Sequence, residues 1–427
     1  MLNKDQQAIA EEFRDFLFSD DKEFLIDASA GYGKSYLMKH LATVSFKEYL
    51  EGCKAINVEP KYRDIALTAT TNKAAESLET ATGMDTSTIQ SLFGLIVRPD
   101  FEKGTTELKK SNKTSVICNT VIFIDECSMV DSKLLEFINE LTHECKIIYV
   151  GDKYQLTPVK SGLSPVYSKH LKEHTLTIPM RNANHQELID LCNQLKETVI
   201  TGEFKPIKLY KGIIDLYDND LIAQAYKQEF VDKNGNEARS LTYTNKQAVT
   251  YNNYIKNLRG QTEVYNDGDY YIANSVCCLG NKTIHVEDEV YIERVFKRGI
   301  QRSLAEGYPP VSLTEALVKW HGIELHVALP ESYMQIKALL KMLSKDKKWY
   351  QYFAIKEGYL DLRPRDACTI HKAQGSTLET VFIDANDLST CTQSGVTARL
   401  LYVACSRAKS HIIFYGDLKR KYGLFCN

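Results

Sequence analysis

The chain has 427 residues, too many for one typical domain of about 100 to 200 residues, so two to four domains are expected. Its 53 basic and 55 acidic residues give a net charge of -2, which argues neither for nor against nucleic acid, because a local basic groove suffices to bind a strand. The 44% hydrophobic content excludes general disorder, and the 11 cysteines, without a CxxC pair, fit neither a disulfide framework nor a zinc site.

The first part of the chain alternates strands with helices or loops. Helices are predicted at residues 5–18 and from 34 to about 49. Strands are predicted at residues 23–28, 65–70, 121–125 and 146–151. Successive units of this kind predict a doubly wound parallel α/β domain over residues 1–185. No signal peptide or membrane-spanning apolar run is found, which predicts a soluble cytoplasmic protein without a membrane partner.

The segment from Ala28 to Ser35 reads Ala-Ser-Ala-Gly-Tyr-Gly-Lys-Ser and joins the first strand to the following helix. This placement suits phosphate binding, because backbone N–H groups at a helix N-terminus hold phosphate oxygens. Lys34 is expected to reach the β- and γ-phosphates of a nucleotide, and Ser35 to bind Mg²⁺. The remaining loop residues expected to hold the nucleotide are Ala30, Gly31 and Gly33.

Asp125 and Glu126 follow an apolar strand. Two adjacent carboxylates are usually just an exposed turn, but this pair follows the phosphate loop by about 90 residues, as the acidic pair of a nucleotide hydrolase does. Asp125 is therefore expected to hold the metal ion. Glu126 is expected to orient or deprotonate the attacking water.

A polar stretch at residues 93–115 interrupts the first domain, and its Lys103-Gly104 turn predicts an inserted hairpin. Phe101 is a candidate for stacking on a nucleic-acid base; packing at the base of the hairpin is the alternative.

A second α/β domain is predicted over residues 186–285 and 366–427. Its strands are expected at residues 238–244, 366–369, 380–384 and 411–415. Residues 286–365 are predicted to form an accessory insertion, with strand-like pieces at 289–296 and 324–329 and a lysine-rich helical run at 332–356.

A series of further segments occurs in a fixed order around these motifs. The segments are Leu67–Ala75, Ser87–Leu92, Asp125–Met129, Tyr149–Val159, Met180–Asn182, Leu241–Asn245, Thr369–Thr377 and Leu401–Ala408. In this series the chain resembles the superfamily 1 DNA helicases, in particular their RecD and Dda-like group. Thr70 and Gln90 depart from the proline and histidine usual in the family. The resemblance implies an α/β fold with two RecA-like parallel-sheet domains, the inserted hairpin in the first domain and the larger insertion in the second.

The resemblance also implies roles for individual residues. Gln6, with Gln7 as the alternative, is expected to read the adenine, and Gln155 to sense the γ-phosphate. Arg181 and Arg407 match the two catalytic arginines, and Gly375 lies in a segment expected at the nucleotide. The residues expected to contact the DNA strand are Thr71, Asn72, Thr88, Gln90, Thr244, Asn245, His371 and Lys372.

Together these assignments predict an ATP- and Mg²⁺-dependent helicase. By resemblance, it is expected to move 5′ to 3′ on single-stranded DNA and to unwind forked or tailed duplexes in phage replication or recombination. A monomer in the host cytoplasm is expected, with a single-strand-binding protein as a candidate partner. The alternatives are a translocase that strips bound proteins, an RNA motor, and a non-motor nucleotide-dependent binding module, because phosphate contacts alone do not read the sugar.

Overall fold

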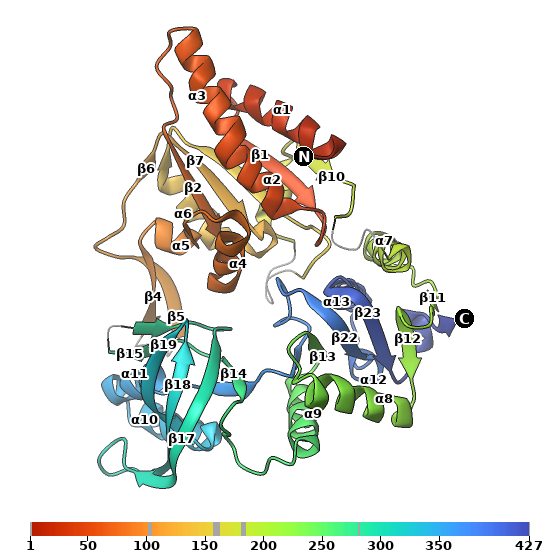
Figure 1. Ribbon diagram of the computed structural model, residues 1–427. Coiled ribbons are helices and arrows are strands. Elements are labelled where there is room, and N and C mark those ends of the chain that lie inside the picture. The colour runs from red at the N-terminus through yellow and green to blue at the C-terminus, as the bar shows by residue number, and fades with distance from the viewer. Residues whose placement is uncertain (1, 101–104, 157–162, 181–184, 281, 427) are drawn as a thin grey trace. The chain divides into compact units, whose positions relative to one another are not determined.

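The computed structural model describes residues 2–100, 105–156, 163–180, 185–280 and 282–426 (Figure 1). The chain divides into two compact units. Unit 1 consists of Met1–Arg98, Leu108–Asn219 and Ala373–Asn427, and unit 2 of Pro99–Glu107 and Asp220–Lys372. Among the described residues, no helix is both long and apolar enough to cross a membrane.

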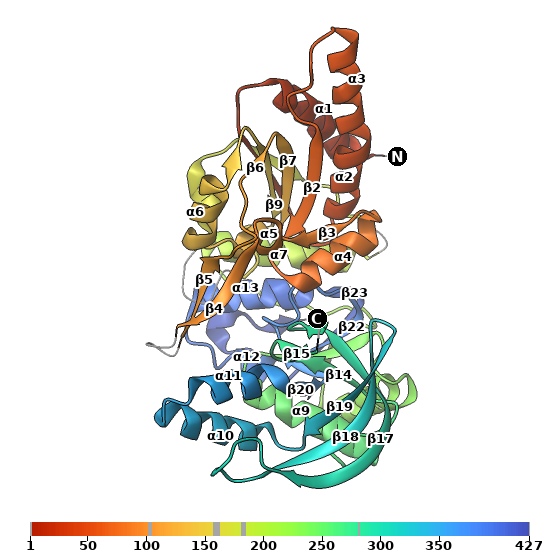
Figure 2. The same cartoon turned by 90° about the vertical axis from the view of Figure 1, so that its left-hand side faces the viewer.

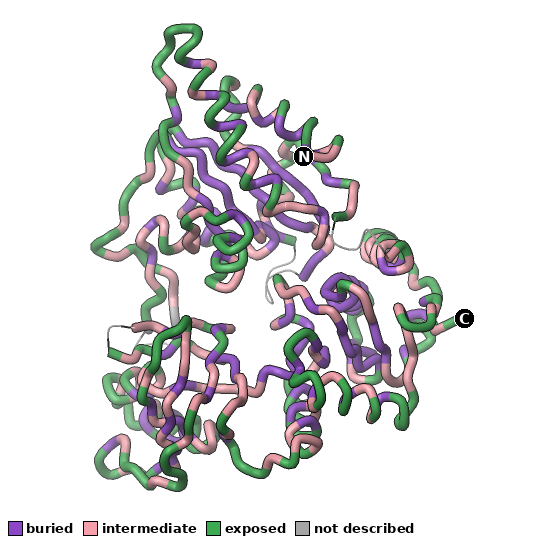
Figure 3. Tube along the Cα trace, in the orientation of Figure 1, coloured by how far each residue is buried: buried purple, intermediate pink, exposed green. Residues whose placement is uncertain are grey.

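A parallel sheet of six strands forms the centre of unit 1, in the order β10-β1-β9-β7-β2-β3. Its strands are β1 (Glu23–Ala28), β2 (Asp64–Ala69), β3 (Thr86–Thr88), β7 (Thr120–Asp125), β9 (Lys146–Gly151) and β10 (Glu173–Leu176). The four strands predicted for the first domain therefore all form. Every residue of β7 and β9 is buried, as expected for parallel strands that are covered on both faces (Figure 3).

Alternate residues of β7 belong to two different cores. Val121 and Phe123 pack with three helices on one face, whereas Ile122 and Ile124 pack with α6 on the other. The helices of the first face are α1 (Lys4–Phe18), α2 (Lys34–His40) and α3 (Phe46–Ala55), and α6 is Ser132–Glu140. Figure 2 shows the sheet between these two layers. The predicted parallel α/β class is confirmed.

Short elements complete this part of unit 1. The helices and turns are η1 (Leu41–Ser45), α4 (Asn72–Thr82), α5 (Ile89–Leu92), η2 (Cys127–Met129) and η3 (Pro165–Lys169). The π-helical turn η1 divides the single helix predicted from residue 34 to about 49. Strands β6 (Ile117–Cys118) and β8 (Thr142–His143) form a parallel pair. The predicted hairpin consists of β4 (Leu95–Asp100) and β5 (Thr105–Lys110), which pair with each other, and its predicted turn lies outside the described residues.

The C-terminal part of unit 1 contains three parallel neighbours, β12 (Ile214–Tyr217), β23 (Ala408–Tyr415) and β22 (Leu378–Asp384). Helix α13 (Ser394–Cys405) packs against α7 (Gln186–Thr201), and 8 of its 12 residues are buried, so it is an internal helix. The remaining elements are β11 (Ile207–Lys208), α12 (Ala385–Leu388), η5 (Arg420–Tyr422) and β24 (Phe425–Cys426), where β11 and β24 pair.

In unit 2, β13 (Ala238–Thr242) and β21 (Ala367–Thr369) form a parallel pair. The helical elements beside them are α8 (Asn219–Tyr226), η4 (Lys227–Asp232) and α9 (Asn245–Leu258). The Asn252 amide of α9 bonds both the N–H and the carbonyl of Ala367, each at 2.9 Å. Arg259 and Asp366 form a two-point ion pair at 2.7 and 2.9 Å. These contacts fix α9 to β21.

An antiparallel sheet forms the rest of unit 2, in the order β19-β18-β17-β14-β20. Its strands are β14 (Tyr270–Ala273), β17 (Glu289–Arg302), β18 (Val311–Trp320), β19 (Ile323–Pro330) and β20 (Leu362–Pro364), with the small hairpin β15 (Cys277–Leu279) and β16 (Lys282–Ile284) nearby in the chain. The helical run predicted at 332–356 is two helices, α10 (Tyr333–Lys345) and α11 (Trp349–Gly358). The sheet includes β14, which precedes residue 286, and β18, which the sequence analysis does not predict.

Candidate active site

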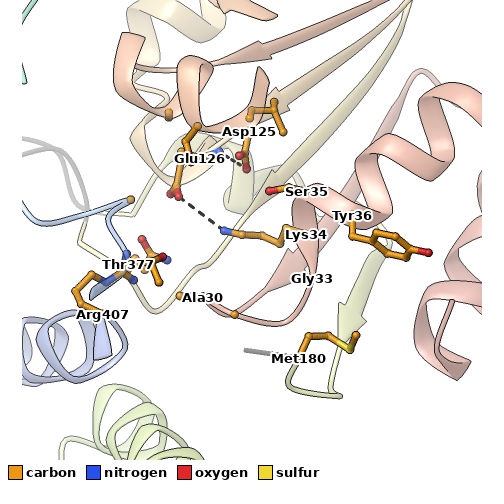
Figure 4. Close-up of a pocket in the computed structure, with 16 residues that line it drawn as sticks. Ala30, Gly33, Lys34, Ser35, Tyr36, Asp125, Glu126, Met180, Thr377 and Arg407 are labelled. Atoms are coloured by element: carbon orange, nitrogen blue, oxygen red, sulfur yellow. Dashed lines mark hydrogen bonds and ion pairs between the residues drawn. The ribbon is translucent and has the colours of Figure 1, made fainter. Parts of the chain in front are cut away.

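A pocket of about 310 Å³ lies at the edge of the unit 1 sheet where the parallel strands end (Figure 4). A volume of this size accommodates a small molecule. The residues that line it all belong to unit 1: Ala30, Gly31, Gly33, Lys34, Ser35, Tyr36, Ala74, Ser77, Leu78, Asp125, Glu126, Gln155, Met180, Gly375, Thr377 and Arg407. Most of the nucleotide-binding and catalytic candidates from the sequence therefore meet in one place.

The phosphate-binding loop owes its shape to two glycines. Gly31 and Gly33 have φ of 87° and 81°, in the left-handed region that L side chains rarely adopt. A Cβ atom on Gly33 would lie 2.8 Å from Gln6 Nε2 and 3.2 Å from Met180 Cγ. Gly33 is also the N-cap residue that directly precedes α2. The N-terminus of α2 therefore faces the pocket, as phosphate binding requires.

The Lys34 ammonium is buried, and its nearest acidic atom is Glu126 Oε1 at 3.8 Å (Figure 4). Neither Lys34 Nζ nor Glu126 Oε2 has a hydrogen-bond partner among the described residues. Burial lowers the pKa of Lys34, but the carboxylates of Glu126 and Asp125 outweigh it, so the pKa is raised and the side chain stays cationic. Unpaired buried charges are costly, and a bound ligand would supply the missing partners.

Asp125 and Glu126 occupy the end of β7. Burial raises the pKa of Asp125 to about 6, although Lys34 opposes the shift. Glu126 has φ 52° and ψ 43°, a left-handed conformation that is strained for a non-glycine residue. This conformation turns the chain at the strand end, and Asp125 Oδ1 accepts a hydrogen bond from the Glu126 N–H at 2.9 Å. Both carboxylates thereby line the pocket.

Gln155 and Arg407 reach the pocket from two separate segments of unit 1, Leu108–Asn219 and Ala373–Asn427. Gln155 Nε2 donates to Asp152 Oδ2 at 3.2 Å, and its Oε1 accepts from Gln374 Nε2 at 3.1 Å. The buried Arg407 guanidinium donates to the Val403 and Ser376 carbonyls, at 3.1 and 3.3 Å. Burial lowers the pKa of Arg407, and Glu126 opposes this shift.

Other candidates lie outside the pocket or outside the described residues. Gln6 is buried beside the loop, and its Nε2 lies 3.4 Å from the Gly33 carbonyl, but it is not among the described residues that line the pocket. Its Oε1 instead accepts from the Asn3 N–H in the capping box of α1. Arg181 and Phe101 lie outside the described residues.

The strand-contact candidates of unit 1 lie at the ends of β2 and β3, which are parallel neighbours. Thr71 caps α4 by accepting from the Ala74 N–H, and Asn72 is the first residue of that helix. Thr88 caps α5 in the same way, and Gln90 lies within α5. The carboxyl ends of parallel neighbours meet at one edge of a sheet, so these residues form one group.

The candidates of unit 2 form a second group, at the ends of the parallel pair β13 and β21. Thr244 caps α9, which begins at Asn245. His371 and Lys372 directly follow β21, and Lys372 Nζ donates to Asn274 Oδ1 at 2.7 Å. Burial lowers the pKa of both His371 and Lys372.

Several residues that line the pocket are absent from the sequence-based prediction. They are Tyr36, Ala74, Ser77, Leu78, Met180 and Thr377. Tyr36 had a usable signal, because an exposed aromatic residue in the first turn after a phosphate loop is well placed to meet a ligand; its exposed fraction is 46%. Met180 donates its N–H to the Gly31 carbonyl at 2.8 Å, a contact between backbone atoms that leaves no mark in the sequence.

Two protein-family models match the chain. A model described as an AAA domain matches residues 1–211, and a model described as a UvrD-like helicase C-terminal domain matches residues 366–415. The first match contains the phosphate-binding loop and the acidic pair, and the second contains Gly375 and Arg407.

Two curated proteins are similar to the chain over nearly its whole length. The uncharacterized protein R530 of Acanthamoeba polyphaga mimivirus is 21% identical and covers 97% of this chain and 99% of its own length. The ATP-dependent DNA helicase dda of Enterobacteria phage T4 is 22% identical and covers 91% of this chain and 93% of its own length.

Among solved structures, the Pif1 helicase from Bacteroides in complex with ADP-AlF3 and ssDNA is similar to the chain with a TM-score of 0.53. The two are 15% identical, and the match covers 99% of this chain and 94% of the other. At this identity the likeness shows the fold, in which the parallel sheets are those of RecA-like domains.

Proposed function

We propose that the chain, as a superfamily 1 ATP-dependent DNA helicase of the Dda and Pif1-like group, moves 5′ to 3′ along single-stranded DNA and separates the duplex ahead of it. The observation that carries the proposal is the pocket of unit 1, where buried Lys34 Nζ and Glu126 Oε2 have no partner among the described residues. A nucleotide and its attacking water supply the partners that these two atoms need.

For hydrolysis we assign Lys34 to the β- and γ-phosphates, because its cation and the N-terminus of α2 face the same pocket. Glu126 is assigned to the attacking water, whose proton its unpaired oxygen accepts. Gln155 and Arg407 supply donors to the charge that develops on the transferred phosphoryl group, and Arg181 is proposed as a second arginine. We still assign Gln6 to the adenine. Its side chain must leave the capping box of α1 to make this contact.

The pocket also fits a divalent cation. Ser35 and Asp125 both line it, and a hydroxyl with a carboxylate is an oxygen donor set that suits Mg²⁺. Mg²⁺ held there would neutralise negative charge on the phosphates. We therefore propose Ser35 and Asp125 as the metal ligands. The raised pKa of Asp125 describes the pocket without a cation, and a nearby cation favours the ionised carboxylate.

For movement we propose that the strand contacts both groups of residues at the strand ends, Thr71, Asn72, Thr88 and Gln90 in unit 1 and Thr244, Asn245, His371 and Lys372 in unit 2. Hydroxyl and amide groups at helix N-termini suit phosphate oxygens. Nucleotide-driven rearrangement of the two groups along one strand would give translocation. Similar proteins support the DNA substrate, since one is a DNA helicase and another is a helicase in complex with ssDNA.

The remaining assignments complete the proposal. We place the RecA-like domains at residues 1–185 and at 186–285 with 366–427, the pin hairpin with Phe101 at 93–115, and the accessory domain at 286–365. Forked or tailed duplexes in phage replication or recombination are the proposed substrates, with a monomer in the host cytoplasm and a single-strand-binding protein as a partner.

Strand displacement on duplexes with a single 5′ or 3′ tail tests the proposal. With ATP and Mg²⁺, we expect displacement from the 5′-tailed duplex only. Displacement from the 3′-tailed duplex alone would refute the polarity. Release of streptavidin from a biotinylated single strand without any duplex separation would instead identify a stripping translocase.

A further inference from the structure

The turn that carries Gln155 is attached to helix α13 by one arginine. Arg399 Nη1 donates to the carbonyl oxygen of Lys153 at 2.6 Å and to that of Gln155 at 2.7 Å. Hydrogen bonds from a charged donor are roughly twice as strong as neutral ones. Two of them from one nitrogen fix the backbone on both sides of Tyr154.

Tyr402 lies three residues further along α13 and holds the other end of the same turn. Its hydroxyl donates to Asp152 Oδ2 at 2.7 Å. Asp152 is fully buried, and it also accepts from the Tyr154 N–H at 3.0 Å and from Gln155 Nε2 at 3.2 Å. The Asp152 carboxylate therefore connects Tyr402 to the side chain of Gln155.

The same helix leads directly to the second polar group of the pocket. Helix α13 ends at Cys405, and Arg407 follows two residues later, with its Nε bonded to the Val403 carbonyl of α13 at 3.1 Å. One buried helix thus positions both Arg407 and the turn of Gln155. Residues 399 and 402 share one face of the helix, because side chains three or four positions apart are neighbours.

We infer that Arg399 and Tyr402 are positioning residues for hydrolysis: Arg399 holds the backbone of the turn and Tyr402 holds Asp152, and together they direct the Gln155 amide into the pocket that Arg407 also lines. Neither residue is among the described residues that line the pocket, so neither is expected to touch the nucleotide. The inference rests on the proposed function of the pocket. A displacement of about 1 Å of a catalytic group can lower the rate about 100-fold, so loss of the Arg399 or Tyr402 contacts should slow hydrolysis.

The test uses steady-state ATP hydrolysis by the full chain with saturating single-stranded DNA. Arg399→Met removes both hydrogen bonds but keeps an unbranched side chain. We expect kcat to fall about 10- to 100-fold while the KM for ATP changes less than about threefold, because the turn is needed in the transition state and not for binding. Arg399→Lys keeps a cation that can donate to a carbonyl, and it should restore part of the lost kcat.

A matched control exists in unit 2. Arg239 Nη1 also donates to two carbonyl oxygens, those of Gly235 and Ala238, each at 2.7 Å. Arg239→Met therefore removes the same pair of bonds away from the pocket and should leave kcat near the wild-type value. An equal fall of kcat in the Arg239 and Arg399 variants would overturn the inference, because it would reflect a general loss of structure.

A double-mutant cycle identifies the residue through which Arg399 acts. If Arg399 works through Gln155, the double variant Arg399→Met with Gln155→Ala should lose no more kcat than Gln155→Ala alone. Multiplied losses would overturn the inference. Tyr402→Phe, which removes only the hydroxyl, should show the same non-additivity with Gln155→Ala, and it serves if Arg399→Met does not fold. Absence of DNA-stimulated hydrolysis in the wild-type chain would refute the proposed function itself.

Discussion

Two lysines with buried ammonium groups lie at opposite ends of the strands of the same parallel sheet and have opposite surroundings. Lys34 follows the carboxyl end of β1, and its Nζ has no hydrogen-bond partner among the described residues. Lys146 opens β9 at the amino edge, where its Nζ donates to the Ser19 and Asp21 carbonyls and lies 4.2 Å from the centre of the Phe16 ring. Lys146, whose ammonium is hydrogen-bonded, connects segments of the fold. Lys34, whose ammonium has no hydrogen-bond partner among the described residues, is available to a ligand. In open α/β sheets, ligands bind at the carboxyl edge.

The largest expected effect is from Lys34→Ala. Hydrolysis of ATP should fall about 1,000-fold or more, because a donor to the transferring phosphate is lost. Unfolding by denaturant should show only a small loss of stability, since the removed ammonium has the Glu126 carboxylate at 3.8 Å but no hydrogen bond in the described chain. The variant should still bind single-stranded DNA in a fluorescence anisotropy assay. Wild-type turnover in this variant would contradict the role of the carboxyl edge.

Glu126→Gln should lower hydrolysis by about 100-fold, because the amide cannot take up a proton from water. The Gln side chain has nearly the same shape, so binding of a fluorescent ATP analogue should persist. If binding and hydrolysis fell together, Glu126 would be needed mainly to hold Lys34, its 3.8 Å neighbour.

Lys146→Met, at the amino ends of the strands, should lower stability and leave hydrolysis unchanged. It removes a charged donor from the Ser19 and Asp21 carbonyls, and we expect a loss of about 3 kcal/mol in the free energy of unfolding. The ATPase kcat of the folded fraction should be unchanged. If kcat fell although the variant was fully folded, the amino and carboxyl ends of the sheet would be energetically coupled.

Asp27 of β1 is intermediate between the two lysines, because its carboxylate has partners but burial still disfavours its charge. Its substitution should give the smallest effect. Its carboxylate accepts from the Lys153 N–H at 3.1 Å and lies 3.6 Å from Lys153 Nζ, but burial and the neighbouring Asp152 raise its pKa to about 6. A folded-state pKa above the unfolded value means that stability from this group is present below about pH 4 and is lost as pH rises through about 6.

Asp27→Asn should therefore be more stable than the wild type by about 2 kcal/mol at pH 7, and equally stable near pH 4. Chemical denaturation of both proteins between pH 4 and pH 8 measures the difference. A variant less stable than the wild type at pH 7 would show that Lys153 stabilises the Asp27 carboxylate more than burial penalises it.

The phosphate loop, the acidic pair and the parallel strands could be predicted because each lies within a short continuous segment. The strand that ends at Ala28 and the helix that begins at Lys34 are patterns of neighbouring residues, and both form, with η1 dividing the helix. The antiparallel sheet was harder at one edge, where β14 pairs with the distant β20, although β17, β18 and β19 pair with their neighbours in the chain. Strand β18 alternates buried and partly exposed residues over much of its length, and this two-residue period is a sequence pattern that could have predicted the strand.

Two features of the site could not be read from residue types. Arg399 acts on carbonyl oxygens of the turn, and every residue type offers a carbonyl, so the sequence at Lys153 and Gln155 gives no sign of it. Gln6 illustrates the opposite difficulty. The sequence motif predicts that it reads the adenine, but in the structure its side chain lies beside Gly33 and takes part in the capping box with Asn3, a competing contact that the motif does not reveal.

The order in which the pocket residues are synthesised has a consequence for the newborn chain. The phosphate loop leaves the ribosome early, whereas Gly375, Thr377 and Arg407 belong to the last segment of unit 1, Ala373–Asn427. Folding during translation proceeds from the N-terminal side. A partly made protein can thus acquire the nucleotide cradle while it still lacks the arginine that completes it. The complete set of pocket residues is therefore present only after the segment Ala373–Asn427 has been synthesised.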